Sequence, residues 1–96
     1  MNTENGKIEG NVEVLEDFQL NGTITGNATV KSGAFFRLNG VVVGNLTIEN
    51  GGSSEINGTV NGNVINEGGT VSVAGVVLGA IYGEANISPN AIIGKA

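Results

Sequence analysis

The sequence contains no cysteine and no histidine. The absence of cysteine excludes a disulfide framework, a thiol nucleophile and a metal site built on thiolates. The absence of histidine removes the most common general base, and with it the serine–histidine–aspartate arrangement and most catalytic zinc sites. We therefore predict a protein that is not an enzyme and that has no catalytic residues, no cofactor and no metal site.

Positive charge is also scarce. Nine acidic residues outnumber four basic ones and give a net charge of −5. The basic residues are Lys7, Lys31, Arg37 and Lys95. Because nucleic-acid binding depends on clustered Lys and Arg, we do not expect a nucleic acid as a partner. Glu13, Glu16 and Asp17 lie close together in the sequence, but their spacing matches no cation-binding loop, and we interpret them as solvated surface charges.

Long apolar runs are missing as well. Residues 1–10 include no apolar run and therefore do not resemble a signal peptide. No stretch approaches the length of about 20 apolar residues that a transmembrane helix needs. We expect a cytoplasmic protein.

What the sequence does contain is a repeated motif rich in Gly and Asn. Its clearest copy is NGTITGN at residues 21–27. The other copies are NGKIEGN at 5–11, NGVVVGN at 39–45, NGTVNGN at 57–63 and AGVVLGA at 74–80. The first Gly residues of successive copies are separated by 16, 18, 18 and 17 residues. A step this constant indicates one structural unit repeated along most of the chain.

Apolar and polar residues alternate around each copy, which is typical of strands, and Gly and Asn suit the corners between strands. Examples of the alternating apolar pairs are Val12 and Val14, Ala28 and Val30, and Leu46 and Ile48. A unit of this length cannot bury its apolar stripe alone, so we expect the units to stack, about 4.8 Å apart, with parallel pairing. The sequence predicts an all-β protein, a single-stranded right-handed parallel β-helix (β-solenoid) of about five turns with roughly 16–18 residues per turn.

The expected organisation is a polar lead-in at residues 1–4, a β-helix domain at residues 5–88 and a partial turn or cap at residues 89–96. Pro89 cannot donate a ladder hydrogen bond and marks the last boundary. A left-handed hexapeptide helix is the alternative, because apolar residues recur every six positions from Val12 to Ile48. That hexad fails at Ser54 and Asn66, so we favour the right-handed form.

The repeat places equivalent residues of successive turns above one another. The predicted buried column contains Ile24, Val42 and Val60. The predicted ladder of hydrogen-bonded side-chain amides contains Asn21, Asn39 and Asn57. Alternation also places Phe36 inside the β-helix and Phe35 at its surface.

The two ends of the predicted β-helix differ. The first turn has a charged surface, which discourages the addition of further strands. Its charges are Glu9, Glu13, Glu16 and Asp17. The last turn has lost the Asn corners and is apolar, so we predict a homo-oligomer joined at this end, plausibly head to head with two-fold symmetry. The predicted interface residues are Val76, Leu78, Tyr82, Ile92 and Ile93.

The frame of an apolar residue, Asn-Gly, an alternating triplet, Gly-Asn and a second alternating triplet resembles the bactofilin domain. It occurs at residues 20–30, 38–48 and 56–66, and the resemblance covers roughly residues 5–88. Bactofilins are bacterial polymer-forming cytoskeletal proteins with a compact right-handed β-helix. The resemblance implies nucleotide-independent self-assembly into oligomers or filaments and a scaffold role. Residues 1–4 do not match the short membrane-binding segment of many bactofilins, so membrane association is not expected.

An alternative function is that of a small acidic module that binds another protein through an apolar outer face. The outward residues expected to form this face are Val41, Val43, Val76 and Leu78. Phe35 is a further candidate for side-face contact, together with Val41 and Val43. Under this interpretation the partner is a second protein rather than another copy of the chain. An enzyme is the third hypothesis and the one that the sequence favours least.

Overall fold

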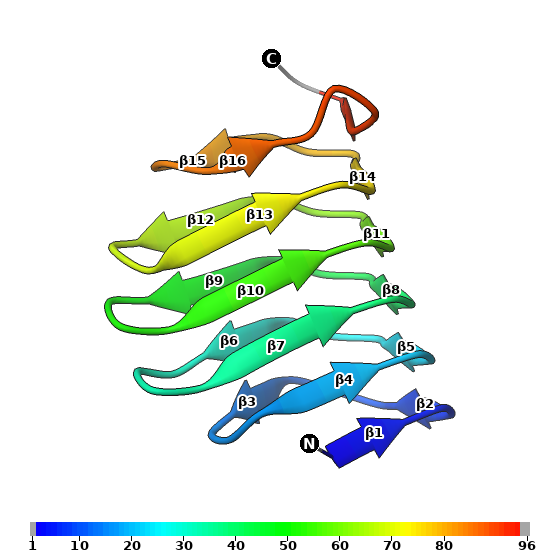
Figure 1. Ribbon diagram of the computed structural model, residues 1–96. Coiled ribbons are helices and arrows are strands. Elements are labelled where there is room, and N and C mark those ends of the chain that lie inside the picture. The colour runs from blue at the N-terminus through cyan, green and yellow to red at the C-terminus, as the bar shows by residue number, and fades with distance from the viewer. Residues whose placement is uncertain (1, 95–96) are drawn as a thin grey trace.

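Three parallel sheets wrap around one core in the computed structural model, which describes residues 2–94. Each turn of the chain contributes one strand to each sheet, so that the strands climb as a ramp from the N-terminus to the C-terminus (Figure 1). The coil is right-handed and has five complete turns and a partial sixth, which confirms the predicted β-solenoid. Residues 2–94 contain no helix, and hence no helix long and apolar enough to cross a lipid bilayer.

The strands are short because a corner interrupts the chain after every few residues. Sheet A consists of β1 (Asn2–Glu4), β4 (Phe18–Leu20), β7 (Phe35–Leu38), β10 (Ser53–Ile56), β13 (Thr70–Val73) and β16 (Asn86–Ile87). Sheet B consists of β2 (Lys7–Ile8), β5 (Thr23–Ile24), β8 (Val41–Val42), β11 (Thr59–Val60), β14 (Val76–Val77) and β17 (Ile92–Ile93). Sheet C consists of β3 (Val12–Val14), β6 (Ala28–Val30), β9 (Leu46–Glu49), β12 (Val64–Glu67) and β15 (Ile81–Tyr82).

The first turn begins earlier than the sequence indicated. The expected lead-in contains β1, which pairs in parallel with β4 and places Glu4 beside Leu20. This strand was not predicted because its side chains are polar and show no apolar alternation. Met1 of the expected lead-in, and Lys95 and Ala96 of the expected C-terminal partial turn, lie outside the described residues.

Inward-facing residues form columns in which each side chain lies over its equivalent in the turn below. The column of sheet B is Ile8, Ile24, Val42, Val60, Val77 and Ile93, which confirms the predicted buried stack. The main column of sheet A is Glu4, Leu20, Leu38, Ile56, Val73 and Ile87. The main column of sheet C is Val12, Ala28, Leu46, Val64 and Ile81. Between the two ends these columns are almost entirely buried and make up most of the core.

A second column of sheet A explains why the hexad failed at Ser54. Phe18 and Phe36 stack in this column with ring centroids 5.9 Å apart, and Ser54 lies directly above Phe36. Ser54 is 3% exposed, and its hydroxyl donates a hydrogen bond to the Phe36 carbonyl oxygen at 3.2 Å. A satisfied hydroxyl can therefore occupy a core position between apolar neighbours.

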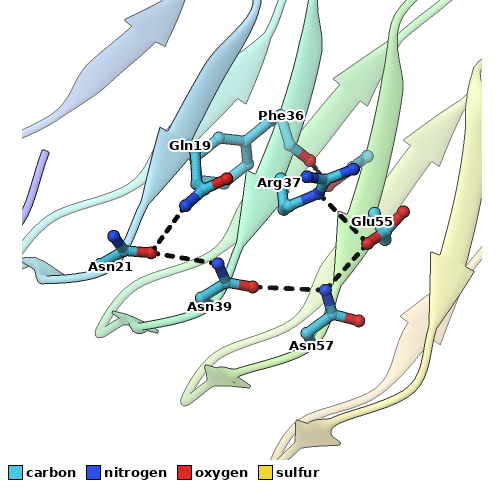
Figure 2. A network of polar contacts seen from close by, with 8 residues as sticks. Gln19, Asn21, Phe36, Arg37, Asn39, Glu55 and Asn57 are labelled. Carbon is cyan, nitrogen blue, oxygen red and sulfur yellow. Dashed lines mark hydrogen bonds and ion pairs between the residues drawn. The ribbon is translucent and has the colours of Figure 1, made fainter. Parts of the chain in front are cut away.

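Two ladders of asparagine hold the corners. In the first Asn ladder (Asn5, Asn21, Asn39, Asn57), each upper side-chain amide donates to the Oδ1 below, at 2.7, 3.0 and 3.3 Å. Figure 2 shows the two upper contacts, from Asn39 to Asn21 and from Asn57 to Asn39. In the second Asn ladder (Asn11, Asn27, Asn45, Asn63), each Oδ1 accepts the backbone N–H of the equivalent residue in the turn above, at 2.8–2.9 Å. The first ladder confirms the predicted stack, whereas the second was not predicted. Gly at these corners is required by close stacking, since a Cβ on Gly22 would overlap the Gly6 carbonyl oxygen.

Candidate functional site

The C-terminal end of the solenoid exposes the last residue of a core column. In the main column of sheet A, Val73 is 2% exposed, while Ile87 directly above it is 51% exposed. The columns of sheets C and B end in Ile81 and Ile93, which are half-buried and pack against the core. One isoleucine per sheet therefore forms an apolar surface, which we call the isoleucine end (Ile81, Ile87 and Ile93).

The backbone at this end is open in the same way. Strands β15, β16 and β17 each pair with a strand below and, among the described residues, with none above. Unpaired strand edges next to an apolar core are a template for pairing with another chain. The isoleucine end thus offers both apolar side chains and free backbone hydrogen-bonding groups.

The predicted interface residues lie around this end rather than at its centre. Leu78 and Ile92 are exposed on the outer face of sheet B, and Val76 lies half-buried between them. Tyr82 is exposed on the outer face of sheet C. Of the five predicted residues, Ile93 alone belongs to the isoleucine end.

Ile81 and Ile87 were not among the interface residues predicted from the sequence. Earlier members of the Ile87 column precede an Asn-Gly or Ala-Gly corner, whereas Ile87 precedes Ser88 and Pro89. Ile87 is also closer in the sequence to its partner in the turn below, Val73, than earlier members of the column are to theirs. The alternation carried too little signal to place Ile87 in a core column without the register.

The N-terminal end has different chemistry. The main column of sheet A begins there with Glu4, and Asn2 stands at the inward position below Phe18. Glu4 is half-buried, and its carboxylate accepts an exposed hydrogen bond from the backbone N–H of Gly6 at 3.0 Å. Five of the nine acidic residues lie in this first turn. They are Glu4, Glu9, Glu13, Glu16 and Asp17.

A hollow of about 270 Å³ opens at this end between β3 and the corner that leads to β4. Its apolar wall includes Leu15, which is 67% exposed, and Phe18, which is half-buried. Glu13 and Glu16 line it as well. The N-terminal end is thus a mixed surface of apolar and acidic groups rather than a uniformly charged one.

The outer faces also differ in charge. In sheet B, Val41 and Val43 face outward, and Val43 is 43% exposed. The outward positions of this face from β5 onward hold only Thr, Val, Asn, Leu, Ile and Gly in the described residues. Phe35 lies on sheet A instead, beneath the Arg37 guanidinium at 5.6 Å from its ring centroid. The three candidate side-face contacts, Val41, Val43 and Phe35, therefore occupy two different faces.

Sheet C has a charged outer face with one ion-pair cluster. Lys31 Nζ lies 3.0 Å from Glu49 Oε2 and 3.9 Å from Glu13 Oε2. The hydrogen bond to Glu49, and the nearby charges of Glu49, Glu13 and Glu67, raise the pKa of Lys31 above its ordinary value, against a smaller effect of desolvation. This cluster lies on the outside of the solenoid and connects the first turn to the third.

None of the protein-family models, curated proteins or solved structures compared with this chain matches it. Within residues 2–94 no group of three His, Cys, Asp or Glu side chains comes close enough to hold a metal ion. The surfaces with distinctive chemistry are the isoleucine end, the acidic N-terminal end and the uncharged outer face of sheet B. The function is therefore best argued from these surfaces.

Proposed function

We propose that this protein is a non-enzymatic structural protein that associates with a second copy of itself through the isoleucine end and acts as a scaffold. The observation that carries the proposal is the exposure of Ile87 at the end of a column whose other apolar members are buried. A core column that ends at the surface is stabilised when a partner continues it, because apolar area leaves water. The resemblance of the repeat to bactofilins supports a role of the same kind.

The heights of the last strands determine which contact between two copies continues all three sheets without a missing strand. The chain climbs one strand spacing, about 4.8 Å, per turn, so β15 lies about a third of a spacing below β16, and β17 lies as far above it. A two-fold axis that crosses sheet A half a strand spacing above β16 then pairs β16 antiparallel with its own copy. The same rotation brings β17 of each copy one full spacing above β15 of the other. All three sheets continue across a head-to-head joint.

A head-to-tail joint fits less well. If β1 of a second copy follows β16, and β2 follows β17, then β3 lies two spacings above β15. One strand place in sheet C stays empty, and the backbone groups that border it lack partners. The described strands therefore favour the two-fold joint, which is also the commonest arrangement of identical chains.

Charge favours the same joint. Between residues 70 and 94 the only ionisable side chains are those of Tyr82 and Glu84. Two acidic chains can therefore meet at the isoleucine end with few like charges in contact. The expected contact combines apolar burial at the centre with strand pairing at the three edges.

Sedimentation velocity over a concentration series tests the proposal with two matched variants. Ile87→Arg places a charge at the centre of the joint, and we expect a folded monomer where the wild type forms a dimer. Leu15→Arg places the same charge at an exposed leucine of the other end and should sediment like the wild type. A wild type that remains monomeric at high concentration, or an Ile87→Arg variant that associates as well as the wild type, would refute the proposal.

The uncharged outer face of sheet B supports a second candidate function, the binding of another protein. Apolar patches without charges commonly mark interaction sites, and Val41 and Val43 lie near the middle of this face. In that case Val43→Lys would abolish binding of the partner and leave self-association unchanged. Loss of self-association in Val43→Lys would instead assign this face to contacts between copies of the chain.

A further inference from the structure

The two ends of the main column in sheet A carry opposite chemistry. Its last residue, Ile87, is apolar and exposed, whereas its first, Glu4, is a carboxylate placed directly below the fully buried Leu20. Side chains at this position face the core in every other turn. Glu4 therefore presents a carboxyl group at the place where the next turn of a continued solenoid would require an apolar core residue.

We propose that Glu4 closes the N-terminal end, so that assembly stops at two copies instead of continuing into a filament. This inference rests on the proposed self-association for the size of the assembly, but the state of the N-terminal end can be tested without it. Glu4 acts here as a specificity-determining residue for contacts between copies. The partner that it excludes is a second copy of the chain.

Either possible joint at this end buries the Glu4 carboxylate. In a head-to-tail joint, the register of sheet A places Glu4 directly over Ile87 of the other copy. In a tail-to-tail joint, a two-fold axis that crosses sheet B half a strand spacing below β2 places β1 next to β3 of the other copy. Glu4 then lies against the inward Val12 and Val14. A carboxylate buried against aliphatic side chains loses its hydration without gaining a cation.

The surroundings of Glu4 offer no compensation in the described residues. The one hydrogen bond of its carboxylate comes from the backbone N–H of Gly6. Lys7 is the only basic residue of the first turn, and it faces outward on β2, on the opposite side of the strand from Ile8. The remaining acidic residues of the turn would add repulsion across a tail-to-tail joint, chiefly at low ionic strength.

The first test compares the wild type with Glu4→Leu and with the control Glu9→Leu. Glu9 is exposed and outward in the same turn, so both variants lose one charge and gain one leucine. By sedimentation velocity and electron microscopy, we expect dimers for the wild type and Glu9→Leu, and long filaments for Glu4→Leu. Filaments of the wild type, or Glu4→Leu dimers that do not grow, would overturn the proposal while leaving self-association intact.

The second test isolates the N-terminal end. Ile87→Arg blocks the other joint, and Glu4→Leu is then added to it. We expect the double variant to form dimers at a concentration roughly tenfold or more below any at which Ile87→Arg begins to associate. A double variant no more associated than Ile87→Arg would overturn the role of Glu4, whatever the wild type does. This result does not depend on whether the isoleucine end joins two copies.

Discussion

The first and last turns of this solenoid are built from one repeat but end it differently. The first turn opens the main column of sheet A with Glu4, and the last turn closes it with Ile87. Both Asn ladders start in the first turn, whereas Ala74 and Ala80 replace asparagine in the fifth. The difference teaches that the repeated columns determine the fold, while the residues that terminate the columns determine what the protein can contact.

The largest effect should come from placing the same charge at three heights of the sheet B column. Val42→Asp buries an unpaired carboxylate between two turns and should cost about 5 kcal/mol of stability, enough to prevent folding. Ile8→Asp and Ile93→Asp at the two ends should fold, because one side of each residue is open. Circular dichroism with thermal melting tests this order.

Only one of the two end variants should affect association. Ile93→Asp lies in the isoleucine end and should be monomeric, whereas Ile8→Asp should still dimerise. Sedimentation of both variants at one concentration makes the comparison. If the two end variants associate equally, the two ends do not differ in the way proposed. If Val42→Asp is as stable as the wild type, Val42 is not buried between two turns.

The interior of the fold was predictable because its signals are local and repeated. Alternation placed Ile24, Val42 and Val60 in one column, and the Asn-Gly corners gave the spacing of the turns. The ends were not predictable in the same way. Glu4 lies in a strand without alternation, and Ile87 precedes Pro89 instead of a Gly corner. A residue of the first or last turn has an equivalent residue in only one adjacent turn, so the repeat constrains its position less than it does in the interior.

The second Asn ladder was missed for another reason. The sequence shows asparagine at each Gly-Asn corner but not whether its side chain points along the axis or outward. In the structure Asn45 Oδ1 accepts the backbone N–H of Asn63, which joins two turns through the main chain. Residue type alone does not distinguish this contact from the side-chain pairs of the first ladder.

The two ladders should differ in their contribution to stability. Asn45→Ala leaves the partly buried N–H of Asn63 without its acceptor and should cost about 2 kcal/mol. Asn39→Ala removes exposed bonds between side chains and should cost about 0.5 kcal/mol, since water replaces them. Urea unfolding of both variants measures the difference. Equal losses would indicate that the second ladder does not hold the corners through the backbone.

The absence of ladders from the C-terminal end can be reversed. Ala74→Asn places an amide above Asn57 Oδ1 at an exposed corner and should raise the free energy of unfolding by about 0.5 kcal/mol. Ala74→Asp is the matched control, because its carboxylate has the same shape but no N–H to donate. Urea unfolding should show a gain for Ala74→Asn alone. A gain in both variants would point to a local turn preference instead of the ladder.

The smallest expected effect on stability concerns Lys31, which connects Glu13 of the acidic first turn with Glu49 of the third. Its pKa in the folded protein is raised above the ordinary value of 10.5, chiefly by the hydrogen bond to Glu49. A group whose folded pKa is raised contributes its full stabilisation below the unfolded pKa and loses it as the pH rises through the folded value. The melting temperature of wild type should therefore exceed that of Lys31→Met at about pH 8, and the difference should shrink as the pH rises above 10.5. Groups that titrate in both proteins cancel in this difference, so a gap that stays constant to high pH would show that Lys31 stabilises the fold through its aliphatic chain and not through its charge.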